Sequence, residues 1–141
     1  MIIVGACCMN GGVGYKGKLP WKHKADMNHF RKMTMGKTIL VGRKTYENIP
    51  PLKGRNVVVL SRSGNLLKDY IGENVLLIGG PEVWKEAFSY DCVDKIILTY
   101  INIDVNCDSY FPLGQLRNYD IESVERISAD ASVITYNKKM I

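Results

Sequence analysis

A single acidic residue, Asp26, stands where an acid could do chemistry. It follows a glycine-rich stretch and the tripeptide Leu19-Pro20-Trp21, and its predicted helical face also carries Met27 and Phe30. A carboxylate among apolar side chains has a raised pKa or a dedicated cationic partner, as a catalytic or ligand-pairing acid needs. An isolated acid at the start of a helix would be explained by the helix dipole alone. The aromatic and apolar neighbours favour the functional interpretation.

Cations and hydroxyl groups gather at two further places. Gly42 ends an apolar run and is followed by Arg43, Lys44 and Thr45, and the next apolar run ends at Ser61-Arg62. This composition suits a phosphate group, although the P-loop spacing is absent. Two such groups at the ends of successive strands indicate one site for a ligand with several phosphate charges.

A glycine pair, Gly79-Gly80, separates another apolar run from a helix that is predicted to begin at Pro81. Paired glycines allow a backbone geometry that is closed to other residues, and the helix N-terminus then faces a phosphate or a ring edge. Plain turns also contain glycine pairs, so both interpretations stay open at this point. The segment Asp108–Pro112 by itself predicts a turn.

A second glycine motif, Gly12 to Gly17, has the spacing G-x-G-x-x-G. The dinucleotide-binding fingerprint must also open a helix, but Leu19 precedes a proline and is pushed away from helical geometry. No acidic residue follows a second strand at the distance needed to bind a ribose hydroxyl. Residues 9–22 are therefore predicted to form a long, mobile loop that closes over a site, and we call this segment the lid.

Apolar runs alternate with helical patterns along the chain. We expect strands at residues 2–8, 38–42, 56–61, 74–79 and 95–101, and a C-terminal hairpin at about 119–127 and 132–139. We expect helices at about 23–35, 44–49 and 81–89, with a short one near 66–71. This alternation predicts one α/β domain over residues 1–141, with a mostly parallel central sheet, flanking helices and a C-terminal antiparallel hairpin. Such sheets bind ligands at the carboxyl ends of their strands, where the motifs above lie.

The composition fits a globular chain, with 46% hydrophobic and 23% charged residues. No apolar run approaches the roughly 18 residues of a membrane span, and no cationic stretch precedes the first apolar run as in a signal peptide. We therefore expect a cytoplasmic protein. The four cysteines lack metal-site spacing, so we expect buried, reduced thiols and no metal. The net charge of +5 fits an anionic partner, but the cations are scattered, so a polyanionic small molecule explains it as well as nucleic acid does.

In combination, these motifs resemble the dihydrofolate reductase family over the length of the chain. The resemblance rests, in chain order, on Leu19-Pro20-Trp21, Asp26, Val41–Thr45, Leu52–Asn56, Ile78–Gly80, Leu98-Thr99 and Asp108–Pro112. It implies a dihydrofolate reductase-like fold and the NADPH-dependent reduction of 7,8-dihydrofolate to 5,6,7,8-tetrahydrofolate. In that reaction a hydride goes to C6 of the pterin and a proton to N5.

The resemblance also implies roles for individual residues on the substrate side. Asp26 would bind the pterin edge with two hydrogen bonds and stabilise positive charge on the ring, and Thr99 would hydrogen-bond this carboxylate. A water admitted past Leu19 would deliver the proton, and Arg55 would clamp the substrate's α-carboxylate. The implied catalytic set is Asp26, Leu19, Trp21 and Thr99. The implied substrate set is Val4, Gly5, Ala6, Asp26, Met27, Phe30, Ile49, Leu52, Arg55, Ile78 and Thr99.

On the cofactor side, the resemblance implies NADPH, because three cations near one ribose favour a 2′-phosphate over a hydroxyl. The bond between Gly79 and Gly80 would be cis, as is common in this family, and would contact the nicotinamide and pyrophosphate side. The implied cofactor set is Ala6, Gly14, Leu19, Gly42, Arg43, Lys44, Thr45, Ser61, Arg62, Ile78, Gly79, Gly80, Glu82, Val83 and Trp84.

Two features depart from the family pattern. The crossover between Ser61 and Val75 is shorter than usual, and Trp84 stands where the family usually carries tyrosine or phenylalanine. Two alternatives therefore remain: a pyrimidine reductase of riboflavin synthesis, and a folate-binding, reductase-like structural protein. The first has no reason to keep Asp26 together with Arg55. We expect a monomer with a small-molecule substrate and no specific nucleic-acid or membrane partner.

Overall fold

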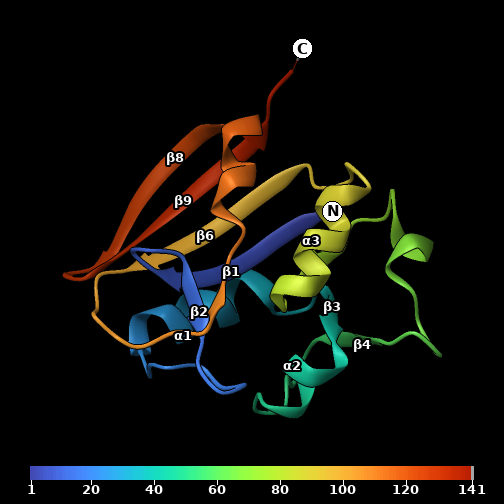
Figure 1. Ribbon diagram of the computed structural model, residues 1–141, viewed down its shortest axis with the longest axis horizontal. Coiled ribbons are helices and arrows are strands. Elements are labelled where there is room, and N and C mark those ends of the chain that lie inside the picture. Colours follow the sequence, from blue (N-terminus) through green and yellow to red (C-terminus); the bar gives the residue numbers. More distant parts are fainter. Residues whose placement is uncertain (141) are drawn as a thin grey trace.

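The computed structural model describes residues 1–140, and its centre is a seven-stranded sheet in the order β4-β3-β5-β1-β6-β9-β8 (Figure 1). Strands β1, β3, β4, β5 and β6 are parallel to one another, whereas β9 is antiparallel to both β6 and β8. The predicted fold class is thus confirmed. The bounds of these strands are β1 (Ile2–Cys8), β3 (Thr38–Gly42), β4 (Asn56–Leu60), β5 (Leu76–Leu77), β6 (Lys95–Ile101), β8 (Tyr119–Ser128) and β9 (Ala131–Lys138).

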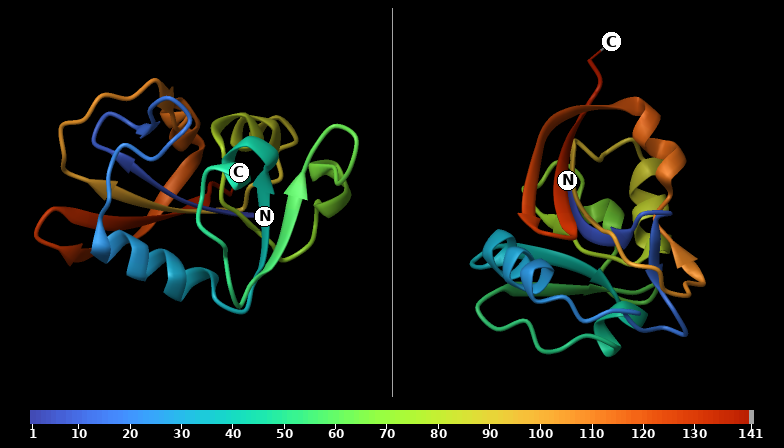
Figure 2. Two further views of the ribbon diagram at one scale, coloured as in Figure 1. Left: turned by 90° about the horizontal axis from the view of Figure 1, so that it is seen from below. Right: turned by 90° about the vertical axis from the view of Figure 1, so that its left-hand side faces the viewer.

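Helices cover both faces of this sheet, with α1 (Lys24–Thr34) on one side and α3 (Pro81–Ser89) on the other (Figure 2). A short helix, α2 (Arg43–Glu47), follows β3 directly. The helices expected at 23–35, 44–49 and 81–89 are confirmed, with α2 beginning one residue early. The helix expected near 66–71 is a single 3-10 turn, Leu67–Tyr70, and a second 3-10 helix at Leu113–Asn118 was not expected.

Alternate residues of β1 enter two separate apolar cores. Ile3 and Cys7 pack in the cluster that contains Trp84 of α3, whereas Val4 packs in the cluster that contains Phe30 of α1. Successive side chains of a strand point to opposite faces of its sheet, so a strand covered on both faces is apolar throughout. This explains why the parallel strands occur in the sequence as unbroken apolar runs.

The lid and the segment 108–112 differ from what the sequence predicts. Part of the lid, β2 (Gly12–Gly14), pairs antiparallel with β7 (Ser109–Tyr110) in a small second sheet. The amide of Phe111 donates to the carbonyl of Gly11 at 2.8 Å and so extends the contact. The prediction of a continuous loop and of a simple turn was therefore wrong at these residues. Glycine has little intrinsic strand preference, so only the distant partner makes this segment a strand.

The four cysteines are free thiols, and Cys7, Cys8 and Cys92 are buried as expected. Cys8 and Cys107 lie close to the backbone of Gly12 from two sides. A Cβ added at Gly12 would lie 2.8 Å from the Cβ of Cys107 and 2.9 Å from the Sγ of Cys8. The first residue of β2 is thus restricted to glycine by close approach.

Among residues 1–140, none of the helices has both the length and the apolar character that crossing a membrane requires.

The variant Gly12→Ala tests this packing. We expect it to lower the free energy of unfolding by about 1–3 kcal/mol, because overpacking a filled site forces its neighbours to move. Gly114→Ala is the matched control, since a Cβ added there meets nothing within 4 Å, and it should stay within about 0.5 kcal/mol of the parent. Urea titration monitored by circular dichroism measures both. Equal stability of the two variants would contradict the packing described here.

Candidate active site

Several of the predicted site residues lie near the edge of the sheet where the parallel strands end. Gly42 is the last residue of β3, and Ile78 directly follows β5. Ala6 of β1 lies beside Thr99 of β6 in the parallel register. Thr99 is 1% exposed and stands two residues after Ile97, which belongs to the core cluster beneath α1. Thr99 therefore faces the side of the sheet that α1 covers.

The carboxyl group of Asp26 is buried at the start of α1, with the residue 9% exposed. Burial raises its pKa above the ordinary value for aspartate, while the nearby His23 ring and the indole N–H of Trp21 lower it by smaller amounts. Burial, with smaller contributions from Cys8 and Asp26, also raises the pKa of Cys7 in β1 to about 12. The carboxyl group thus lies close to both the lid end and the first strand.

The indole N–H of Trp21 is a buried donor beside this carboxyl. It acts on the pKa of Asp26, yet within residues 1–140 its Nε1 has no partner at hydrogen-bond geometry. A buried donor without a partner is costly, and binding sites are where such groups are found. The Asp26 carboxyl group and the Trp21 indole therefore place a hydrogen-bond acceptor and a donor next to each other, where one ligand could contact both.

Apolar side chains beside Asp26 remain accessible. Leu19 of the lid is 57% exposed and Met27 of α1 is 50% exposed. Phe30, one helical turn after Asp26, is half-buried against the core. Large exposed apolar side chains near a buried polar group mark a surface that a ligand with an apolar body can cover.

Arg55 is held at the opposite end of α1. Its Nη1 donates to the Oγ1 of Thr34 at 3.1 Å, and its Nε donates to the carbonyl of Lys53 at 3.0 Å. The Thr34 hydroxyl in turn donates to the carbonyl of Phe30 at 2.7 Å. At 1.5 Å of rise per residue, Thr34 stands roughly 12 Å along the helix from Asp26. The two groups could therefore bind the opposite ends of one elongated ligand.

The glycines expected at the cofactor form a close backbone contact, which we call the glycine cradle (Gly42, Thr45, Gly79, Gly80 and Val83). The amide of Gly42 donates to the carbonyl of Gly79 at 2.8 Å. A Cβ at Gly80 would lie 2.8 Å from Thr45 Oγ1, and one at Gly42 would lie 3.1 Å from Val83 Cγ2. The Gly79–Gly80 bond is cis, as the resemblance implied. The cradle joins β3, α2 and the start of α3.

Asp108 attaches the lid to the segment before β7. The sequence by itself predicts only a turn at this residue. The Asp108 carboxylate accepts a hydrogen bond from the amide of Lys16 at 3.0 Å, and its own amide donates to the carbonyl of Gly14 at 2.8 Å. At the lid tip, a Cβ on Gly17 would lie 3.8 Å from Asn48 Nδ2, just after α2. The lid therefore extends from β1 across to α2.

The comparisons with known proteins agree with this geometry. A family model described as dihydrofolate reductase matches residues 1–140. The chain belongs to the dihydrofolate reductase family. It is 32% identical over 145 residues to the dihydrofolate reductase of Haemophilus influenzae, a match that covers 91% of this chain and 88% of that protein. It is 32% identical over 133 residues to that of Buchnera aphidicola, covering 83% of this chain and 81% of that protein.

A third relative has a longer chain. The bifunctional dihydrofolate reductase-thymidylate synthase of Paramecium tetraurelia is 29% identical over 145 residues. The match covers 91% of this chain but only 31% of that protein, so nothing about its second activity carries over. This chain is an oxidoreductase that acts on dihydrofolate with a nicotinamide cofactor, as its family does.

Trp84, the departure from the dihydrofolate reductase pattern, is a core residue. It is 3% exposed, its Nε1 donates to the carbonyl of Leu77 at 3.4 Å, and its ring lies 5.2 Å from that of Phe111. A Cβ at Gly5 would lie 3.2 Å from the indole, and one at Gly79 would lie 3.6 Å from it. The larger ring therefore fills the space beneath both glycines.

The cations expected at the reductase's cofactor are exposed. Arg43 pairs with Glu47 on the surface of α2 at 3.3 Å, and Arg62 is exposed in the turn after β4. The short crossover continues from this turn without a regular α-helix. At the start of α3, no side chain caps the free amides. Exposed cations and free helix amides fit an anionic ligand.

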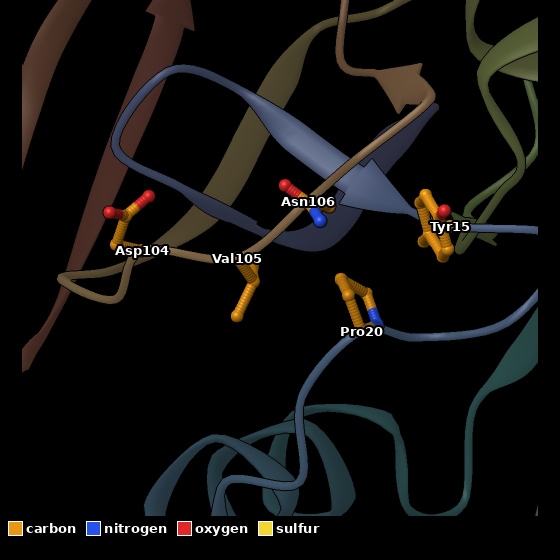
Figure 3. Close-up of a pocket in the computed structure, with 5 residues that line it drawn as sticks. All are labelled: Tyr15, Pro20, Asp104, Val105 and Asn106. Carbon is orange, nitrogen blue, oxygen red and sulfur yellow. The ribbon is translucent and has the colours of Figure 1, made fainter.

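An open hollow lies between the lid and the segment that precedes β7. Its lining residues are Tyr15, Pro20, Asp104, Val105 and Asn106, and Figure 3 shows Pro20 opposite the segment from Asp104 to Asn106. None of them belongs to the expected substrate or cofactor sets. The hollow therefore separates the lid from the segment before β7.

The variant Asp26→Asn should be more stable than the parent at pH 7. Because the folded-state pKa is raised, the folded chain holds this proton more tightly, and parent stability falls as pH rises from about 3.9, the unfolded value, through the folded value. The Asp26→Asn variant has no carboxyl group to titrate and so does not lose this stability. Its melting temperature at pH 7 should therefore be higher than that of the parent by roughly 2–6 °C. The gain should vanish below about pH 4. Differential scanning calorimetry from pH 3.5 to 8 measures it, and a constant difference at every pH would contradict the burial argument.

Proposed function

We propose that this chain binds NADPH and reduces 7,8-dihydrofolate to 5,6,7,8-tetrahydrofolate, with a hydride added at C6 and a proton at N5. The observation that carries the proposal is the buried carboxyl group of Asp26 beside the unpartnered indole N–H of Trp21. The whole chain, residues 1–141, would act as one reductase domain, as a monomer in the cytoplasm.

Asp26 is the group that recognises and activates the pterin. An ionised carboxylate accepts two parallel hydrogen bonds from the amidine-like edge formed by the exocyclic amino group and N3. Positive charge on the ring is favoured by a nearby anion, and burial strengthens this interaction because little water screens it. Thr99, in β6, would add a hydrogen bond to the carboxylate and the amino group, and this contact stays a prediction.

The tail of the substrate would extend along α1. Met27 and Phe30 offer apolar surface for the aminobenzoyl ring, and Ile49 and Leu52, after α2, would cover its other side. Arg55 would then bind the α-carboxylate. Its anchoring to Thr34 and to the backbone of Lys53 limits the rotation of the guanidinium. A held guanidinium loses less conformational entropy on binding a carboxylate.

The glycine cradle and the cations near it support NADPH. A Cβ at Gly80 or Gly42 would meet Thr45 or Val83, so only glycine lets β3, α2 and the start of α3 come together at the proposed cofactor site. The free amides at the start of α3 suit the pyrophosphate, and Arg43, Lys44 and Arg62 suit a terminal phosphate. When bound, the cofactor supplies the hydride. Ala6, Gly14, Ser61, Ile78 and Glu82 complete the proposed contacts.

The lid would exclude bulk water while the hydride is transferred. Its docking through Asp108 holds it over the strand ends, and Leu19 stands next to the Pro20-Trp21 turn that leads to α1. A partly closed lid admits single water molecules, one of which could protonate N5. Water exclusion also strengthens the interaction between Asp26 and the pterin.

The variant Asp26→Asn tests the proposed role of the carboxylate. We expect its turnover of dihydrofolate at pH 7 to fall by about a hundredfold or more, because an amide cannot stabilise a protonated pterin. The loss should shrink at low pH, where the substrate is already protonated. The measurement is NADPH oxidation followed by absorbance, with Asp69→Asn, an exposed acid in the 3-10 turn after β4, as the control. Parent-like turnover of Asp26→Asn would refute the role.

The variant Arg43→Ala tests the choice of cofactor. Loss of a charge-assisted hydrogen bond to a phosphate should cost about 1.5–3 kcal/mol in NADPH binding and much less in NADH binding. The difference should weaken as salt rises, because these cations are exposed. Calorimetric titration of both cofactors measures it, with Arg117→Ala as an exposed control. Equal losses for NADPH and NADH would show that Arg43 does not bind a 2′-phosphate.

A further inference from the structure

His23 connects the start of α1 to a distant part of the chain. Its Nδ1 accepts a hydrogen bond from the backbone N–H of Asp26 at 3.1 Å, so that His23 is the N-cap of α1. Its Nε2 lies 2.8 Å from Oδ1 of Asp130, which is 107 residues away in the sequence. Both ring nitrogens are therefore engaged. The His23 side chain is only 14% exposed, whereas that of Asp130 is 47% exposed.

The two contacts define the protonation of the ring. A nitrogen that accepts from a backbone amide carries no proton, so the ring proton sits on Nε2 and is donated to Asp130. Asp130 also accepts a hydrogen bond from the hydroxyl of Ser128 at 2.8 Å. A chain of hydrogen bonds thus runs from Ser128, at the end of β8, to the Asp130 carboxylate. It continues from Asp130 to the ring of His23, and from the ring to the backbone amide of Asp26.

Capping alone does not require a histidine here. Serine, threonine, asparagine and aspartate are the favoured N-caps, and each satisfies one amide of the first turn. A histidine adds a second nitrogen on the far side of a rigid ring, which allows it to join two elements. At this position the joined elements are the helix that carries Asp26 and the β8–β9 turn.

We propose that His23, oriented by Asp130, is a positioning residue that fixes the first turn of α1 and thereby the direction of the Asp26 carboxylate. The inference rests on the proposed role of Asp26 in the reaction. One further observation supports it. The hydrogen bond from the ring lowers the pKa of Asp130, so this carboxylate stays ionised and able to accept the bond. Lys22 and Lys24 flank His23 in the sequence and are exposed.

Three variants separate the bridge from the cap. His23→Ala removes both contacts, His23→Asn keeps a side-chain oxygen that can cap the helix but cannot reach Asp130 as the ring does, and Asp130→Ala removes the acceptor alone. The double variant His23→Ala/Asp130→Ala completes a cycle. Each is measured for kcat and KM with dihydrofolate, for melting temperature, and for the pKa of Asp26 by 13C NMR of its carboxyl carbon in the free protein. Asp26→Asn assigns that signal.

We expect His23→Ala to lower kcat about tenfold, the lower end of the effect of losing a residue that orients an active-site ligand. His23→Asn should restore the melting temperature, because the cap is replaced, while kcat stays low. The pKa of Asp26 should change in both variants, because the carboxylate then leaves the orientation that the ring and Asp130 fix together. Asp130→Ala should lower kcat in the parent but not further in His23→Ala, since Asp130 acts through the ring.

Glu122→Gln is the matched control, because Glu122 is an acid of similar exposure on β8 that pairs with Lys95 at 3.6 Å. It should leave kcat and the pKa of Asp26 unchanged. The proposal is overturned if His23→Ala or His23→Asn melts lower yet keeps the parent's kcat and Asp26 pKa, since His23 is then only a cap. Additive losses from His23→Ala and Asp130→Ala overturn it as well. Failure of the proposed function is distinguishable, because Asp26→Asn would then retain full turnover.

Discussion

A buried carboxylate is the constraint on which the proposed substrate side of this protein depends. Removing an ionised group from water costs several kcal/mol unless nearby dipoles or charges offset the loss. At Asp26 the offsetting groups come from two directions: the Trp21 indole from the lid end and the His23 ring from the helix cap. Each must be held in place. The lid, the helix start and the β8–β9 turn are therefore connected through one side chain.

The proposed cofactor side depends on close backbone packing instead. There the backbone of Gly42 lies against that of Gly79, and side chains larger than hydrogen would separate β3 from α3. The buried indole of Trp84 packs against Gly79, so the backbone of the glycine pair has little room to move toward the core. The charged groups of this side are cations exposed at the surface, where they can attract an anionic ligand. The substrate side thus relies on a buried charge, whose interactions are strong because the surrounding dielectric is low. The cofactor side relies on surface charges, whose interactions are screened by salt and can change without any change in the core.

The central strands were predicted from local pattern because their burial is two-sided. Thr38–Gly42 and Lys95–Ile101 occur as predicted, since an apolar run between turn residues has few other structures available. The pairing of Gly12–Gly14 with Ser109–Tyr110 was missed, because neither segment has strand character of its own. The 3-10 helix Leu113–Asn118 was missed for a similar reason: it lies between β7 and β8, and its place depends on both.

For the site, the sequence alone determined which residues are candidates for chemistry: the acid Asp26 after Trp21, the glycine pair at 79–80, and the cations after β3 and β4. These signals are local, because residue type and spacing along one element fix them. The tertiary structure alone decided which distant groups act on them. Asp130 reaches His23 across 107 residues, and Asp108 reaches Lys16 across 92. Such contacts depend on how the sheet brings its turns together, and no spacing within a single element encodes that arrangement.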